Sequence, residues 1–235
     1  MVPQWLTNLR SFPGFLAALG ASTLQAAAPV EFWLTTGDLS ERLSPQPPLA
    51  FTAAAARLED RVEIEESITF QTMLGLGSSL EPTTCSNFWR MAAADREALM
   101  ERVVDPEKGI GMNLMRLCIG TPDFTGDPWY SYCDLPPGAT DPALKRFSID
   151  RDRRYIFPVI QLARRKNPAL LFIASPWSPP GWMKNNGSMI GGQLLSQWHP
   201  VYAQYFVRFI QAYEAEGIPI YAIGLCTSRL CRNGW

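Results

Sequence analysis

The stretch ALLFIASPWSPPGWMKNNG, residues 169–187, decides the fold of this chain. Its apolar run at residues 170–173 is typical of a buried strand. The loop that follows holds three prolines and the tryptophans Trp177 and Trp182. Because proline restricts the shape of a loop and tryptophan offers a large flat face with one N–H donor, such a loop suits a pocket for a flat, hydroxylated ligand such as a sugar. A proline-rich turn with two buried tryptophans is the alternative that this stretch leaves open.

Apolar periodicity divides the rest of the chain into alternating strands and helices. Residues 112–119 are apolar apart from Asn113, Arg116 and Cys118, which is typical of a strand buried on both faces. Aromatic residues follow Tyr202 at helical spacing and indicate an amphipathic helix that ends at Gly217. We predict strands at residues 30–36, 62–65, within 68–80, and at 112–119, 170–174 and 218–223. We predict helices at residues 92–104, up to about residue 166, and at 200–217.

This alternation predicts the fold class, α/β, because strand–helix–strand units place parallel strands in one sheet through right-handed crossovers. The chain lacks a dinucleotide-binding fingerprint, since residues 75–78 read GLGS and no third glycine follows. A (β/α)8 TIM barrel is therefore the better interpretation. The four predicted barrel strands and three helices make only its first half. Half a barrel leaves two hydrogen-bonding edges open.

Composition excludes several classes of protein. The 235 residues are 47% hydrophobic and 11% aromatic, which indicates a globular core and argues against disorder. The formal net charge is −1 and no basic patch stands out, so we expect no nucleic acid as a partner. No apolar run approaches the roughly 18 residues of a transmembrane segment. The five cysteines and the single histidine lack the spacing of metal ligands, so we expect no metal site.

We divide the chain into four parts. Residues 1–29 are a leader, 30–67 an N-terminal β segment, 68–224 the partial barrel and 225–235 an aberrant tail. Two interpretations of the leader stay open: a weak secretory signal with a short apolar core, or a disordered or wrongly assigned extension. A signal peptide would direct the protein out of the cell or to a lysosome-like compartment.

Four motifs in register resemble the glucosylceramidase-type glycoside hydrolases, glycoside hydrolase family 30. They are EFWLTTGD at 31–38, FQTMLGLGSSL at 70–80, GIGMNLMR at 109–116 followed by Asp123 and Phe124, and ASPWSPPGWMK at 174–184. The resemblance covers roughly residues 30–224. It implies a retaining (β/α)8 glycosidase whose N-terminal strand belongs to a side β-domain.

The resemblance also implies roles for four residues. Asp123 would hydrogen-bond sugar hydroxyls, Trp177 would form part of the sugar-binding wall, and Phe124 would shape the substrate pocket. Arg116 would orient the nucleophilic carboxylate. Structural alternatives stay open: a loop-capping Asp123, a Trp177 that packs in the core and an Arg116 that is paired elsewhere in the loops. No cofactor is implied, because a pair of carboxylates performs this chemistry unaided.

The sequence departs from the family at the catalytic positions. The family's fourth strand ends in Asn-Glu-Pro, whose glutamate is the general acid/base, and here Thr227, Ser228 and Arg229 hold these positions. Near pH 7 a serine cannot deliver a proton as a carboxylic acid with a raised pKa does. The family's nucleophile would lie beyond Trp235. We therefore expect no catalytic residue in this chain, which would be an inactive fragment.

The genetic code suggests a cause for this departure. Codons for Thr-Ser-Arg can read ACG-AGC-CGN, and the frame one base earlier then contains codons for Glu-Pro. Our hypothesis is a frameshift or a misjoined exon near codons 224–226, with genuine truncation as the alternative. Coding DNA that holds no Glu-Pro in the alternate frame would refute the frameshift.

Three functions follow from the resemblance. The first is hydrolysis of glucosylceramide or related β-glucosides, with a lipid substrate met at a membrane surface. The second is a different specificity in the same family, that of a β-1,6-glucanase or a β-xylosidase. The third is a sugar- or lipid-binding pseudoenzyme that keeps Asp123 and Trp177 without chemistry.

Overall fold

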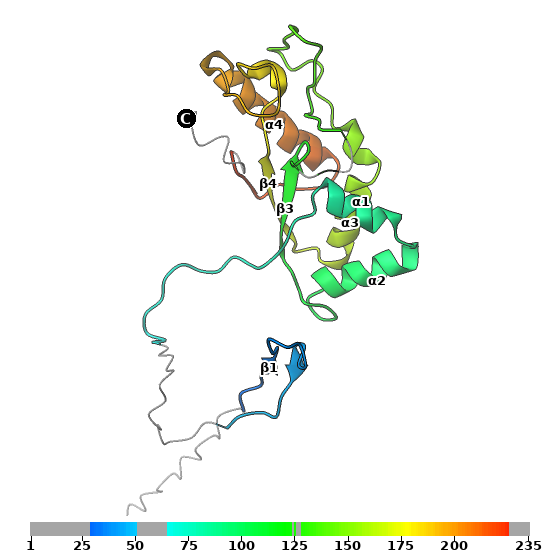
Figure 1. Ribbon diagram of the computed structural model, residues 1–235, viewed down its shortest axis with the longest axis vertical. Helices are drawn as coiled ribbons and strands as arrows, with labels where there is room; N and C mark the ends of the chain where they lie inside the picture. The colour runs from blue at the N-terminus through cyan, green and yellow to red at the C-terminus, as the bar shows by residue number, and fades with distance from the viewer. Residues whose placement is uncertain (1–28, 51–64, 124, 126–127, 226–235) are drawn as a thin grey trace, which may run out of the picture. The chain divides into compact units, whose positions relative to one another are not determined.

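The computed structural model of the protein describes residues 29–50, 65–123, 125 and 128–225 (Figure 1). The chain divides into two compact units, Met1–Thr69 and Phe70–Trp235, and each is described by itself. Within the described ranges, no helix is long and apolar enough to cross a membrane.

The described part of the first unit is a small antiparallel hairpin. Strand β1, Trp33–Leu34, pairs with β2, Ser44–Pro45. The turn between them is organised by the Asp38 carboxylate, which accepts hydrogen bonds from the Thr36 hydroxyl and the Ser40 amide, and these bonds lower the pKa of Asp38 to about 2. The strand predicted at 30–36 is shorter than expected, because only Trp33 and Leu34 have strand geometry. Most of the strand predicted at 62–65 lies outside the described residues.

The second unit is built on a parallel sheet of three strands. Strand β3, Leu114–Ile119, pairs in parallel with β4, Leu171–Pro176, and β4 pairs with β5, Ala222–Ile223. The predicted strands at 112–119 and 170–174 are confirmed. The strand expected at 218–223 is reduced to two residues, in register with Ile173 and Ala174 of β4.

The strand expected within 68–80 lies beside β3 without regular strand geometry. The Arg116 amide donates to the Ser78 carbonyl at 2.9 Å, and the Leu80 amide donates to the Arg116 carbonyl at 2.9 Å. Ser79 and Arg116 form an isolated parallel bridge. This segment therefore occupies the place of the first barrel strand, next to β3, through only a few backbone hydrogen bonds.

Three of the four described helices confirm the sequence prediction: α2, Ala93–Val104; α3, Ile156–Lys166; and α4, His199–Ala215. The fourth, α1 at Pro82–Arg90, was not predicted. Its sequence, PTTCSNFWR, is short and mostly polar, and its few apolar residues gave too weak a signal for a helix. The helix is started instead by Glu81, whose buried carboxylate accepts from the amides of Thr83 and Thr84 at 2.8 and 2.9 Å.

Helix α4 ends as predicted. Gly217 has a φ of 75°, and the Ile218 amide donates to the Tyr213 carbonyl at 2.9 Å. This is a Schellman-type termination, which needs a residue that adopts the left-handed region easily. The aromatic face expected on this helix is buried: Tyr202, Phe206, Phe209 and Tyr213 are all at most 4% exposed.

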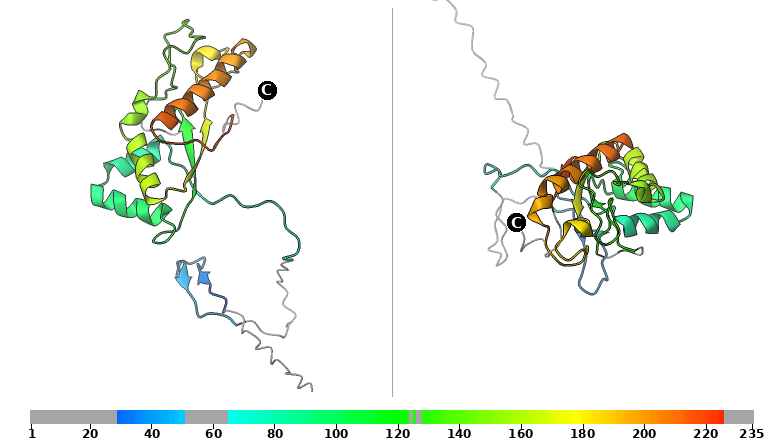
Figure 2. Two further views of the ribbon diagram at one scale, coloured as in Figure 1. Left: turned by 180° about the vertical axis from the view of Figure 1, so that it is seen from behind. Right: turned by 90° about the horizontal axis from the view of Figure 1, so that it is seen from above.

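The helices cover one face of the sheet and leave the other half-exposed. Seen from above, α1, α3 and α4 lie along the same side of the strands (Figure 2). Met115 and Leu117 of β3 and Phe172 of β4 point to that side and are buried. Their neighbours in the sequence, Arg116 and Ile173, are only half-buried. This arrangement, with helices outside and a partly open inner face, is the first part of a TIM barrel, as predicted.

Candidate functional site

The carboxyl ends of β3 and β4 lie next to each other, and the loops that follow them carry the predicted site residues. In a parallel α/β sheet these ends are where ligands bind. Arg116, on the half-exposed face of β3, donates from Nε to the Ser175 hydroxyl of β4 at 2.9 Å. A guanidinium group thus lies on the inner face, joined to the neighbouring strand.

Trp177 follows the last residue of β4 and is 8% exposed. Its ring is tilted against that of Trp129, with 4.9 Å between the ring centroids and 53° between the planes. Trp129 comes from the loop after β3 and is 40% exposed. The two loops therefore meet in an aromatic pair. The sequence analysis missed Trp129, although an isolated tryptophan between polar and proline residues in a loop after a buried strand was the available signal.

Asp123 is exposed near the start of the loop after β3. The other two predicted positions, Phe124 and Ser228, lie outside the described residues. The loop is closed at its base, because Thr121 and Tyr130 exchange hydrogen bonds: the Thr121 amide donates to the Tyr130 carbonyl at 3.1 Å, and the Tyr130 amide donates to the Thr121 hydroxyl at 3.0 Å. Asp123 and Trp129 thus lie on one loop, between the hydrogen-bonded residues Thr121 and Tyr130.

A buried carboxylate fixes this loop to the rest of the unit. Asp152, fully buried just before α3, accepts hydrogen bonds from the hydroxyls of Tyr130, Tyr132 and Tyr213 at 2.7, 2.6 and 2.6 Å. Burial raises the pKa of Asp152, and burial together with the nearby Asp152 raises the pKa of Tyr132 and Tyr213. The tyrosines come from the loop and from α4. The loop that carries Trp129 is therefore preorganised by its own core.

The loop after β4 is held by a buried lysine that sequence reasoning also missed. Lys184 is 7% exposed, and its ammonium donates to the Ser178 hydroxyl at 3.0 Å and to the Met189 carbonyl at 2.9 Å. Burial lowers the pKa of Lys184. The two bonds tie the segment around Met189 to the turn that follows Trp177.

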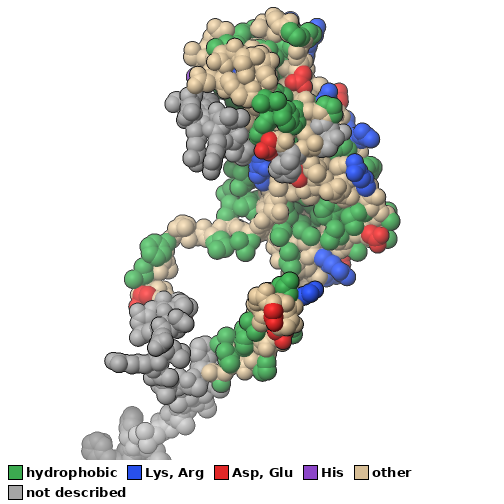
Figure 3. Space-filling view, in the orientation of Figure 1, with side chains coloured by type: hydrophobic (Ala, Val, Ile, Leu, Met, Phe, Trp, Pro, Cys, Tyr) green, Lys and Arg blue, Asp and Glu red, His purple; other side chains and the backbone are tan. Residues whose placement is uncertain are grey.

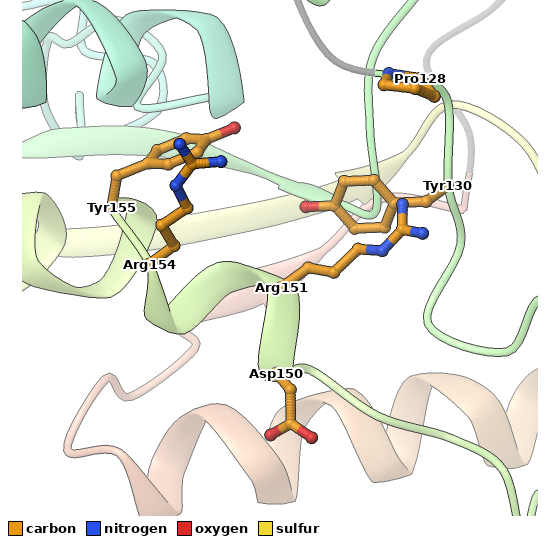
Figure 4. A pocket seen from close by; sticks show the side chains of 6 residues that line it. All are labelled: Pro128, Tyr130, Asp150, Arg151, Arg154 and Tyr155. Atoms are coloured by element: carbon orange, nitrogen blue, oxygen red, sulfur yellow. The ribbon is translucent and has the colours of Figure 1, made fainter.

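A cavity of about 440 Å³ lies on another side of the loop after β3 (Figure 4). The Arg151 guanidinium lies 4.7 Å from the centre of the Tyr130 ring, and Arg154 lies beside Tyr155. Asp150 points away from both arginines and pairs with Arg153 at 3.1 Å. The cavity thus has cationic and aromatic walls, with no carboxylate pair among its lining residues for acid–base chemistry.

The titratable groups of the site suit a neutral, hydroxylated ligand. No cluster of three or more histidine, cysteine or acidic side chains that could hold a metal ion occurs among the described residues. Cys118 and Cys133 are buried, and desolvation raises the pKa of each thiol to about 11, so both are protonated near pH 7. The loop after β3 carries both an exposed carboxylate, Asp123, and Trp129 of the tryptophan pair, so it offers hydrogen-bond acceptors and a flat apolar face.

Comparison with known proteins agrees with this arrangement. The profile of the glycosyl hydrolase family 30 TIM-barrel domain matches residues 73–229. An endo-1,6-β-D-glucanase of Neurospora crassa is 36% identical over 157 residues, which cover 65% of this chain and 32% of that protein. Putative glucosylceramidase 1 of Caenorhabditis elegans is 27% identical over 243 residues, which cover 89% of this chain and 46% of that protein.

A solved structure, the endo-β1,6-glucanase BT3312, superposes with a TM-score of 0.71 at 30% identity, over 87% of this chain and 44% of its own. The chain spans about a third of the length of the endo-1,6-β-D-glucanases that it matches. The matched residues include the parallel sheet, its helices and the loops with Asp123 and Trp177. The chain therefore belongs to glycosyl hydrolase family 30.

Proposed function

We propose that this chain forms the β3–β4 side of the substrate site of a retaining β-glycosidase, and that its substrate is β-1,6-linked glucan. The observation that carries this proposal is the Trp129–Trp177 pair at the carboxyl ends of two parallel strands, on a loop that also carries the exposed Asp123. The endo-1,6-β-D-glucanases among the relatives, at 33 to 36% identity, support the choice of linkage.

In the proposed site each residue has a defined task. Trp177 packs against the apolar face of a glucosyl ring, while the Asp123 carboxylate accepts hydrogen bonds from its hydroxyls. In a complete family 30 barrel, Arg116 would be a positioning residue that holds the nucleophilic carboxylate of the retaining mechanism through charge-assisted hydrogen bonds. Retaining hydrolysis itself needs two carboxylates about 5–5.5 Å apart, one to attack the anomeric carbon and one to protonate the leaving oxygen.

The second part of the proposal concerns hydrolysis and depends on the residue at the acid/base position. Because Ser228 holds it, we propose that the chain binds β-glucosides without hydrolysing them. Purified chain incubated with an aryl β-glucoside is expected to release phenol no faster than buffer does. Hydrolysis that disappears in an Asp123→Ala variant would contradict this and would place a working acid elsewhere in the protein.

Binding tests the site directly. We expect Asp123→Ala to weaken binding of a β-1,6-linked glucose disaccharide about 10- to 100-fold, because a hydrogen bond to a charged group contributes about 1.5–3 kcal/mol. Isothermal titration calorimetry measures the affinity. Asp95→Ala is the matched control, since Asp95 is an exposed carboxylate in the first turn of α2, on the helical side of the sheet. Equal affinities for wild type and Asp123→Ala would refute the site.

Glucosylceramide is the second candidate substrate. The putative glucosylceramidase 1 of Caenorhabditis elegans matches the larger share of this chain, 89% against 65% for the Neurospora crassa glucanase. The same titration with a short-chain glucosylceramide separates the two candidates. Tighter binding of the lipid than of the β-1,6-linked disaccharide would favour glucosylceramide.

A further inference from the structure

A cavity of about 300 Å³ opens on the loop that carries Trp129. Its lining includes Trp129, Asp134, Gly181, Trp182, Ser188 and Met189. The volume is at the lower end of the range for small-molecule sites, which suits a single sugar ring. Because Trp129 both lines this cavity and contacts Trp177, the cavity adjoins the proposed sugar-binding wall.

The aromatic walls of the cavity are held by contacts outside it. The Trp182 indole N–H donates to the Cys133 carbonyl at 2.9 Å, and its ring packs edge-on against Trp198 with 5.2 Å between centroids. Trp129 is placed by its neighbour Tyr130, whose hydroxyl is bound to the buried Asp152. Two tryptophan faces are therefore preorganised before a ligand enters, which lowers the entropic cost of binding.

The polar side of the cavity retains acceptor capacity. Asp134 accepts from the Ser131 hydroxyl through Oδ1 at 2.6 Å and from the Ser131 amide through both oxygens, at 3.1 and 3.0 Å. A carboxylate has about four acceptor positions, so Oδ2 retains capacity for a hydroxyl of a ligand. The cavity thus brings two tryptophan side chains together with the Asp134 carboxylate and Ser188, a combination that suits a hydroxylated pyranose ring.

The rim of the cavity is built by close backbone contact. A Cβ atom at Gly181 would lie 2.8 Å from the Gly187 carbonyl oxygen, so only glycine allows the two segments to approach this closely. Lys184 holds the same segment through the Met189 carbonyl, and the side-chain amide of Asn186 donates to the Ile190 carbonyl at 2.8 Å. The rim is therefore formed by the chain itself and needs no ligand to shape it.

We propose that this cavity is a second sugar subsite, which binds the glucosyl unit next to the one that packs on Trp177. The inference rests on the proposed function, since it places a further unit of the same glycan. Trp129 lies between the two subsites and contacts both. A site of this kind distinguishes oligosaccharides from substrates that carry one sugar, so Trp129 and Asp134 are specificity-determining residues for glycan length.

The test is the dependence of affinity on ligand length, measured by calorimetry on the full chain. We expect a β-1,6-linked glucose trisaccharide to bind wild type at least tenfold more tightly than methyl β-glucoside. Asp134→Asn is expected to remove most of this gain and to change the affinity for methyl β-glucoside less than twofold. Trp129→Ala also removes a ring contact of Trp177, so it is expected to weaken the binding of both ligands, with the larger factor for the trisaccharide. Trp89→Ala is the matched control, because Trp89 is also a half-exposed tryptophan, 42% exposed, but lies on helix α1.

The outcomes separate this inference from the proposed function. The second subsite is refuted if both variants bind the trisaccharide as wild type does, or if each variant loses the same factor of affinity for both ligands. The first subsite is still supported in that case if binding of methyl β-glucoside depends on Asp123. Failure of wild type to bind any β-glucoside overturns both. Circular dichroism of each variant, matched to wild type, verifies that the cavity variants are folded.

Discussion

At the scale of single residues, the most consequential group is the buried Asp152 carboxylate with its three tyrosine donors. Burying a carboxylate is costly, and hydrogen bonds to the charged form offset part of that cost. The balance here raises the pKa of Asp152, with desolvation as the main cause. The same carboxylate joins the loop that carries Trp129 to α4, so its protonation is linked to the stability of the site.

This gives a prediction for the pH dependence of stability. Because its pKa is raised in the folded state, Asp152 keeps its proton over a pH range in which the unfolded chain has released it, so wild type loses stability as the pH rises above the ordinary value of 3.8. Asp152→Asn cannot titrate. The free energy of unfolding of both proteins is measured by urea titration from pH 3 to pH 7. We expect the value for wild type minus the value for Asp152→Asn to fall as the pH rises. A difference that rises with pH would contradict the raised pKa.

At the scale of elements, the segment before α1 depends on close backbone packing. A Cβ atom at Gly77 would overlap the Leu114 carbonyl group of β3. Gly77→Ala must therefore push this segment away from β3 and weaken the Ser78–Arg116 and Leu76–Asn113 backbone hydrogen bonds. We expect a loss of about 2 kcal/mol in the free energy of unfolding, as for two hydrogen bonds of about 1 kcal/mol each.

Hydrogen exchange provides the local measurement, because the Arg116 amide should exchange faster in Gly77→Ala than in wild type. Gly224→Ala is the control: its Cβ atom would meet only the Ser175 side chain, at an ordinary 3.5 Å, beside the same sheet. An Arg116 amide that stays as protected as in wild type would show that the segment accommodates the methyl group.

At the scale of the whole molecule, the described surface carries many large apolar side chains (Figure 3). The segment before α1 holds four of them, Phe70, Met73, Leu74 and Leu76, which are 46 to 87% exposed. Arg116 and Ile173, on the inner face of the sheet, are only half-buried. A TIM barrel covers its inner face by closing eight strands on one another, whereas the sheet described here has three. The sheet described here therefore leaves part of its inner face uncovered.

The sequence alone was enough to predict the parallel α/β architecture, helices α2, α3 and α4, and the loop with Trp177, because these depend on patterns within 10 to 20 residues. The repeat of apolar side chains in α4 and the glycine at its end act locally, so they are visible in the chain itself. The same local signals were too weak for α1, which has few apolar residues and begins at a glutamate cap.

Only the tertiary structure decided how the loops meet. Trp129 and Trp177 come from loops after different strands, and Tyr213 reaches Asp152 across 61 positions of the chain. Such contacts are set by the packing of α4 and the long loop against the sheet, and no spacing in the sequence encodes them. The single sequence therefore determined most of the elements that form, while the folded core determined which residues of different elements touch. Side chains far apart in the chain are brought together only by the burial of the surfaces between them.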